Sequence, residues 1–128
     1  NVKYLDIDST PIASGMYSIT KYLQEVLCRN YVLAHGFSIA CLRIAGGIVC
    51  GRTASYKEGK PLRKGEYSEG WMCRYDIAEA CRLALLATDI AFEIFYIGST
   101  PELFARVNIQ RTVDGLGWHP VYDFQEYR

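Results

Sequence analysis

The sequence predicts an α/β fold in which helices flank a parallel β-sheet. Two short segments are almost wholly apolar and partly β-branched, as buried strands are: Phe37 to Ala45 and Phe92 to Ile97. The segments before, between and after them have helical periodicity instead, with apolar residues recurring at intervals of three and four. Strands that are separated by helices favour parallel pairing, and this arrangement is typical of α/β proteins.

The first helix is predicted from about Ser14 to Ala34. Its apolar residues at helical spacing are Ile19, Leu23, Val26, Leu27 and Tyr31. Gly36 is well placed to end it, because glycine readily adopts the left-handed conformation that follows a last helical turn. The strand Phe37 to Ala45 comes next, and its continuous apolar character predicts cover on both faces. The alternation in Asn1 to Ile7 predicts a short additional strand.

Turn and cap residues predict the remaining elements. From Gly51 to Gly70 the chain is polar and glycine-rich, so we expect a long exposed loop that can hold a short hairpin. Asp76 to Glu79 has the D-x-x-E form of a capping box and predicts a helix start. Ser99 to Glu102, with proline in the first turn, predicts another start, and Gly115 and Gly117 predict the end of that helix.

Length and charge restrict the class of protein. The chain has 128 residues, which fits one domain over residues 1–128. Its 14 Lys and Arg residues balance 14 Asp and Glu residues, which gives no support to nucleic acid or an anionic membrane as partner. No apolar run approaches the ~20 residues of a transmembrane helix, so we expect no membrane span.

The cysteines and histidines predict the compartment and the absence of a metal site. The chain has 5 cysteines and no C-x-x-C pair, which predicts free thiols in a reducing compartment and therefore a cytoplasmic protein. Cys28, Cys41 and Cys81 have apolar neighbours, and we expect them to be buried. The 2 histidines lie far apart in the sequence, so a zinc site is not expected.

Tyr17 and Lys21 are the first candidates for chemistry. They lie four residues apart in a predicted helix and therefore share a face. An ammonium group beside a phenol favours the phenolate, which lowers the pKa of the tyrosine from about 10. Such a tyrosine can exchange a proton with a hydroxyl group while a hydride moves elsewhere. By spacing alone, a chance Y-x-x-x-K on an amphipathic helix is the simpler explanation.

Five motifs that follow one another in a fixed order favour a catalytic origin of the tyrosine–lysine pair over chance. They are Tyr17-Ser18-Ile19-Thr20-Lys21 with Glu25 and the strand ending Leu42-Arg43, then Gly51-Arg52, Met72 to Ala80, Phe95 to Gly98, and Leu116 to Pro120 with Asp123-Phe124. Together they resemble the extended short-chain dehydrogenase/reductase family, the NAD-dependent epimerase/dehydratase group. In that family the corresponding motifs are, in the same order, Y-x-x-S/T-K followed by E and a strand that ends in L-R, then a glycine turn, then H-V-D-D-V-A-x-A, then v-y-n-i-g, and finally L-G-W-x-P…F. The resemblance implies a partial Rossmann-like parallel sheet with flanking helices.

The resemblance also implies roles for individual residues. Tyr17 would be the catalytic acid/base, and Lys21 would hold the nicotinamide ribose hydroxyls and lower the pKa of Tyr17. The backbone of Ala45, Gly46 and Gly47 would approach the nicotinamide, where glycine allows close contact.

Three basic residues are candidates for binding the substrate. Arg52, Arg63 and Lys64 fall in the predicted loop, which by the resemblance belongs to the substrate-binding region. They would meet an anionic group such as a sugar-nucleotide phosphate or a uronate. The alternative is an ordinary solvated loop that binds nothing.

The resemblance covers only the C-terminal half of the family. The G-x-x-G-x-x-G fingerprint with its βαβ unit is absent, and no serine or threonine near Tyr17 matches the family's catalytic one. Cys73 and Tyr75 stand where the H-V-D-D segment has His and Asp. The expected protein is a truncated NAD(P)-dependent sugar epimerase- or dehydratase-like chain, without turnover when isolated. By the resemblance its cofactor is NAD or NADP, and the alternative is that this chain binds none.

The absence of the family's N-terminal half also predicts which partners the chain has. Apolar surfaces on the first helix and the Phe37 strand would normally meet it, and an exposed apolar patch implies association. We therefore expect a homo-oligomer, as a two-fold dimer packed through the first helix and an open sheet edge. A competing hypothesis is a non-catalytic oligomeric binding or interaction module that kept the family's packing. Different chemistry in the loop from Gly51 to Gly70 is a third, and no nucleophile–base pair there supports it.

Overall fold

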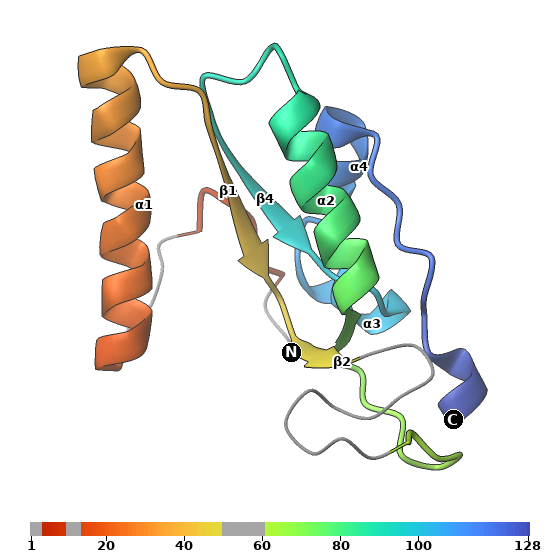
Figure 1. Cartoon of the computed structure of the whole chain (residues 1–128). Helices are drawn as coiled ribbons and strands as arrows, with labels where there is room; N and C mark the ends of the chain where they lie inside the picture. The colour runs from red at the N-terminus through yellow and green to blue at the C-terminus, as the bar shows by residue number, and fades with distance from the viewer. Residues whose placement is uncertain (1–3, 10–13, 50–60) are drawn as a thin grey trace.

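The computed structural model describes residues 4–9, 14–49 and 61–128, which form an α/β fold (Figure 1). In chain order the elements are α1 (Met16–His35), β1 (Ile39–Ile44), β2 (Gly47–Val49), β3 (Trp71–Cys73), α2 (Arg74–Leu86), β4 (Phe92–Ile97), α3 (Pro101–Arg106), α4 (Gln110–Leu116) and the 3-10 helix η1 (Gln125–Tyr127).

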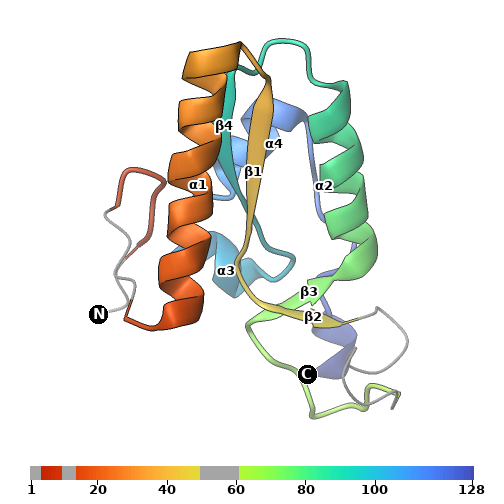
Figure 2. The same cartoon turned by 60° about the vertical axis from the view of Figure 1, so that its left-hand side comes forward.

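β1 and β4 form a parallel pair at the centre of the molecule. Ile39 lies opposite Phe92, and Ile44 lies opposite Ile97. α1 lies on one side of this pair, and α2 and α4 lie on the other (Figures 1 and 2). The predicted parallel pairing of the two apolar segments is therefore confirmed. Within the described residues neither strand has a further partner in its sheet, so each keeps an open edge.

β1 is less buried than its sequence predicts. Its residues are half-buried, and Ile44 is exposed. Helices lie on both faces of the strand pair, as expected, but they do not bury β1 fully. Continuous apolar strands are fully buried where several parallel strands carry helices on both sides. Among the described residues this sheet has only two strands, so each strand has one edge that no neighbouring strand covers.

α1 confirms the first predicted helix, with ends that differ by no more than two residues. The Gly15 N–H donates to Ser18 Oγ at 3.2 Å and so caps the N-terminus. Gly36 ends the helix in the left-handed conformation, with φ 68° and its N–H bonded to the carbonyl of Val32 at 2.9 Å. None of the 20 residues of α1 is buried.

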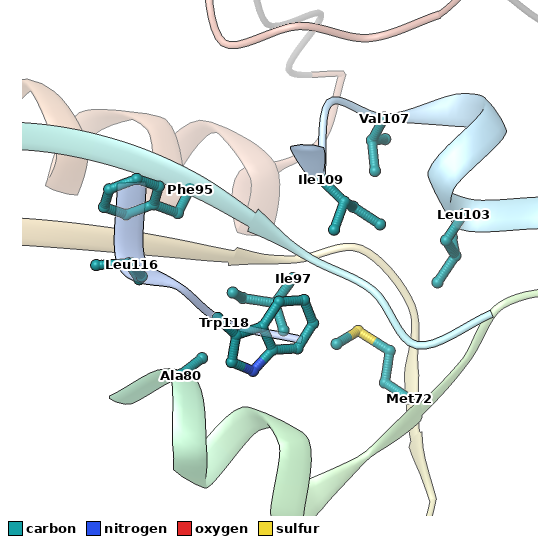
Figure 3. Packing of buried hydrophobic residues seen from close by; sticks show 9 residues of the cluster. All are labelled: Met72, Ala80, Phe95, Ile97, Leu103, Val107, Ile109, Leu116 and Trp118. Atoms are coloured by element: carbon teal, nitrogen blue, oxygen red, sulfur yellow. The ribbon is translucent and has the colours of Figure 1, made fainter. Parts of the chain in front are cut away.

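The main hydrophobic core lies on the side of the sheet that α2 and α4 cover (Figure 3). Its buried members are Met72, Ala80, Phe95, Ile97, Leu103, Val107, Ile109, Leu116 and Trp118. They come from β3, α2, β4, α3, α4 and the segments beside them, and none comes from α1 or β1. Trp118 is completely buried in this core. The two sides of the sheet are therefore unequal, with the core on one and a weakly buried helix on the other.

α2 begins two residues before its predicted start, and Asp76 is not its cap. The capping-box prediction is wrong, because Asp76 is buried and bonds to other parts of the chain. Its carboxylate accepts hydrogen bonds from Ser99 Oγ at 3.2 Å and from the backbone N–H groups of Val121 and Tyr122 at 3.0 and 3.2 Å. Its backbone carbonyl accepts from Trp118 Nε1 at 2.8 Å. Asp76 thus joins α2, the β4–α3 connection and the chain after α4.

A second parallel pair, between β2 and β3, was not predicted. Each of these strands has three residues, which is too short for a period of two to be recognised in the sequence. Residues 61–70 of the predicted loop form turns and no hairpin. The remainder of that loop, residues 51–60, lies outside the described residues.

The chain after β4 forms two short helices where the sequence predicted one. α3 starts after Thr100 as predicted, and Gly117 ends α4 with φ 63°. Between these helices the Leu5 N–H donates to the carbonyl of Arg106 at 2.8 Å, and the Asn108 N–H donates to the carbonyl of Leu5 at 3.0 Å. The strand predicted for residues 1–7 is, in its described part, reduced to this isolated bridge at Leu5.

Candidate functional site

Tyr17 and Lys21 lie in the first turns of α1 and are brought together as the sequence predicts. Lys21 Nζ lies 5.9 Å from the centroid of the Tyr17 ring, and it also donates to Gln24 Oε1 at 3.3 Å. Tyr17 is 77% exposed. The pair therefore stands on an open surface of the described chain, where its phenol and ammonium groups are accessible to a ligand or to another chain.

The tyrosine–lysine pair lies at one end of the parallel strands. α1 runs opposite to β1, so its first turns lie at the same end of the molecule as the carboxyl ends of β1 and β4 (Figures 1 and 2). In open α/β sheets, ligands bind outside the carboxyl ends of the strands. The chain that leaves β1 at this end is Ala45 to Gly47, so the predicted catalytic and nicotinamide-side residues share one end of the fold.

Ala45, Gly46 and Gly47 are held by backbone contacts of different kinds. The Ala45 N–H donates to the carbonyl of Ile97 at 3.0 Å, and the Gly47 N–H donates to the carbonyl of Gly70 at 2.7 Å. A Cβ atom on Gly46 would lie 2.0 Å from the Gly70 oxygen, whereas one on Gly47 would lie 4.0 Å from it. The close approach at Gly46 is thus made by Gly70, and only Gly47 has open space beside its Cα for a ligand.

The predicted substrate-binding residues are only partly described. Arg63 and Lys64 are exposed in the turn before β3, where the Arg63 N–H donates to Glu66 Oε2 at 2.9 Å. Arg52 lies outside the described residues. Arg63 and Lys64 do not line either of the cavities described below, so their geometry fits a solvated turn as well as it fits an anion site.

An ion pair fastens α1 to β1. Arg43 donates from Nε and Nη2 to the two carboxylate oxygens of Glu25, at 2.8 and 2.7 Å, and from Nη1 to Tyr96 OH at 2.9 Å. Both charged side chains are 18% exposed. The hydrogen-bonded carboxylate of Glu25 holds the pKa of the Arg43 guanidinium above its usual range. This bidentate pair sets the position of α1, and hence of Tyr17 and Lys21, on the sheet.

The sequence flagged Glu25 and Arg43 only as motif residues and did not predict their contact. Tyr96, whose hydroxyl also binds Arg43, was likewise flagged only as a motif residue. Arg29, whose guanidinium lies 4.8 Å from the Phe92 ring centroid, was not singled out. A signal for the pair was present, because an arginine within an apolar strand must find a partner when it is partly buried.

We expect Glu25→Gln to lower the free energy of unfolding by about 1–2 kcal/mol, because the half-buried Arg43 loses its charged acceptor. Urea denaturation followed by circular dichroism measures the change. Glu79→Gln is the matched control: its pair with Arg82 is on the surface of α2, and its loss should leave the free energy of unfolding nearly unchanged. Equal effects of the two substitutions would contradict the anchoring role of Glu25.

Two cavities lined by described residues border the sheet, and Tyr17 and Lys21 line neither of these two. The smaller, of about 350 Å³, lies between residues 7–9, α1 and the sheet, and Glu25, Arg29 and Arg43 line it. The larger, of about 930 Å³, lies between the end of α2, the start of β4 and α4. Both are therefore separate from the tyrosine–lysine pair.

Cys28, Cys41 and Cys81 are free thiols, as predicted, but their burial differs from the prediction. Cys28 and Cys41 are half-buried, Cys73 is buried, and Cys81 is exposed on α2. Burial and the neighbouring Cys28 raise the pKa of the Cys41 thiol to about 11, which disfavours the reactive thiolate. Among residues 4–9, 14–49 and 61–128, no three His, Cys, Asp or Glu side chains gather as a metal site.

Comparisons with protein-family models, with curated proteins and with solved structures find no match to this chain. Of the helices in the described part of the chain, none combines the length and the apolar character that a membrane crossing requires.

Proposed function

We propose that this chain is the tyrosine–lysine and substrate-side part of an NAD(P)-dependent sugar epimerase or dehydratase, similar to the C-terminal half of an extended short-chain dehydrogenase/reductase. The observation that carries the proposal is that the first turns of α1, which hold Tyr17 and Lys21, lie at the same end of the fold as the carboxyl ends of β1 and β4. The chain that continues from β1 at this end includes Gly47. This is where an α/β sheet binds a ligand.

The residues present fit the nicotinamide end of a dinucleotide. The exposed Tyr17 hydroxyl can exchange a proton with a substrate hydroxyl, and the Lys21 ammonium can donate to ribose hydroxyls. Gly47 leaves open space beside its backbone. When bound, a nicotinamide dinucleotide supplies the hydride acceptor or donor.

The chain is expected to have no turnover alone. No glycine-rich phosphate loop is present in the sequence, and that loop supplies much of the binding and orientation of the dinucleotide. A second chain, or a longer parent protein, would provide it. The same proposal places the protein in the cytoplasm, which the free thiols support.

Titration with nicotinamide mononucleotide, followed by amide chemical shifts, tests the proposal directly. This ligand has the nicotinamide ribose without the adenosine half. We expect shifts at Tyr17, Lys21 and Gly47 that saturate in the millimolar range, and no saturable shifts in Tyr17→Phe,Lys21→Met. Tyr31→Phe, at the other end of α1, is the control and should bind as the unaltered chain does.

Two results would contradict the proposal. One is the absence of shifts at about 10 mM ligand, and the other is an unchanged response in the double variant. Hydride transfer by the isolated chain, seen as a change in NADH absorbance with a nucleotide sugar, would contradict the expected lack of turnover.

A second candidate function is a non-catalytic oligomeric interaction module. The observation that favours it is α1, which presents many apolar side chains and buries none. Under this hypothesis Tyr17→Phe alters only local packing, and nicotinamide mononucleotide causes no saturable shift. The titration therefore separates the two functions.

A further inference from the structure

The larger cavity lies at the end of the fold opposite to Tyr17 and Lys21. It is bounded by the last turn of α2, the connection from α2 to β4, the first residues of β4, and α4. β4 begins at this end, whereas the first turns of α1 lie at the other (Figures 1 and 2). The cavity volume of about 930 Å³ is in the range of small-molecule sites. The cavity can therefore hold a ligand of its own, away from the proposed nicotinamide site.

Apolar side chains line much of this cavity and continue into the hydrophobic core. Phe95 and Leu116 are buried members of the core, and Leu83 and Ile90 pack against it. Leu86 also lines the cavity and is 64% exposed. A ligand with an apolar body would remove this surface from water, which is favourable.

Carboxylates outnumber cations around the cavity. Its described lining holds Asp89, Glu93 and Asp114 and a single basic residue, Arg111. The Arg111 guanidinium donates from Nη2 to the Glu93 carboxylate, so these two charges neutralise each other. Within the described chain, neither Asp89 nor Asp114 has an ion-pair partner. The cavity therefore has an excess of negative charge that a cationic ligand would complement.

Hydrogen bonds hold the α4 side of the cavity in place. Asp114 Oδ1 accepts from Gln110 Nε2 at 2.9 Å, and the Arg111 N–H donates to Asn108 Oδ1 at 3.1 Å. Asn108 Nδ2 in turn donates to both carboxylate oxygens of Asp6, at 3.1 Å each. These groups are therefore positioned before a ligand arrives, which lowers the entropic cost of binding.

We propose that this cavity binds a small organic cation, a molecule with an ammonium group and an apolar body. The ammonium group pairs with Asp89 and Asp114, and the apolar body lies against Leu86, Ile90 and Phe95. The excess of carboxylates disfavours an anion, and a purely polar cation would leave the apolar lining in water. The proposal does not depend on the proposed function, because the tyrosine–lysine pair does not line this cavity.

Titration of the full chain with 2-phenylethylammonium, followed by amide chemical shifts, tests the proposal. This probe joins an ammonium group to an aromatic ring. We expect saturable shifts at Leu86, Asp89 and Asp114, with a Kd of about 1 mM. The neutral 2-phenylethanol and the anionic 3-phenylpropionate carry the same ring, and both should bind about fivefold more weakly or less.

A pair of double variants tests the charged groups. In Asp89→Asn,Asp114→Asn the affinity for 2-phenylethylammonium should fall about fivefold. Asp123→Asn,Glu126→Gln is the matched control, because it also removes two negative charges, from exposed positions that do not line the cavity. It should bind the probe as the unaltered chain does.

A second pair of variants tests the apolar lining. Leu86→Ala should lower the affinity for 2-phenylethylammonium about threefold, because apolar contact with the ring is lost. Leu85→Ala is the control: Leu85 is the preceding residue of α2, is 86% exposed and does not line the cavity. Circular dichroism spectra that match that of the unaltered chain establish that the variants are folded.

Three results would overturn the proposal. One is the absence of saturable shifts at about 20 mM probe. Another is equal binding of 2-phenylethanol, which would show that the charge is not recognised. The third is an unchanged affinity in folded Asp89→Asn,Asp114→Asn. Tyr17→Phe,Lys21→Met should bind the probe normally, so this titration and the one with nicotinamide mononucleotide can fail independently.

Discussion

Replacement of Asp76 by alanine is expected to lower the free energy of unfolding by about 3–4 kcal/mol, a large part of the 5–15 kcal/mol typical of a domain. The substitution removes an acceptor that binds Ser99 Oγ and two backbone N–H groups. Hydrogen bonds to a carboxylate are stronger than hydrogen bonds between neutral groups. In the variant, the three donors lose this carboxylate as their acceptor. Urea denaturation, with intrinsic tryptophan fluorescence as the signal, measures the change.

Asp123→Ala is the control for this prediction. Asp123 is exposed, and its carboxylate accepts one hydrogen bond, from the Gln125 N–H at 3.1 Å. We expect its loss to change the free energy of unfolding by about 0.5 kcal/mol or less. If Asp76→Ala were no more destabilising than Asp123→Ala, Asp76 would not be the junction that the structure indicates.

The second large effect is expected at Gly46. In Gly46→Ala the new methyl group would lie 2.0 Å from the carbonyl oxygen and 2.8 Å from the carbonyl carbon of Gly70. Both atoms belong to the backbone, so the chain must move, and the hydrogen bond from the Gly47 N–H to the same carbonyl is lost. We expect a loss of about 2–3 kcal/mol in the free energy of unfolding, measured by urea denaturation.

Gly47→Ala is the matched control, because its methyl group would meet nothing closer than 4.0 Å. Its stability should stay within about 0.5 kcal/mol of the unaltered chain. Comparison of the two variants also shows whether glycine is required at position 46, where Gly70 is in contact, or at position 47, where there is open space. A stable Gly46→Ala would mean that contact with Gly70 does not require glycine at that position.

Segments with strong local periodicity were predictable from the sequence. α1 and β4 have the expected type and nearly the expected bounds, because apolar spacing and the flanking glycines are local signals. The short β2–β3 pair and the split between α3 and α4 were not predictable, because contacts between distant segments create them. The same applies to Asp76, whose local sequence resembles a cap while its partners lie 23 to 46 positions away.

In the candidate site, too, features set by local sequence were predictable and features set by contacts between distant segments were not. Helical geometry alone brings Tyr17 and Lys21 together, so their proximity was predictable. Their exposure was not, because it depends on what covers α1. Gly46 shows a second limit. The resemblance implied that its backbone would approach the nicotinamide, whereas in the structure the carbonyl of Gly70 lies against it.

The parallel pairing of β1 and β4 also affects how fast the chain reaches this fold. Arg43 and Tyr96, which meet across the pair, lie 53 positions apart, and Asp6 meets Asn108 across 102 positions. Contacts of such range require closure of long loops before any stabilisation is gained, which slows folding from microseconds towards milliseconds or longer. α1 needs only local contacts and can form within about a microsecond. Newly made chains therefore pass through a period in which a helix with exposed apolar residues is present and the sheet is not, and that period is when they are most prone to aggregate.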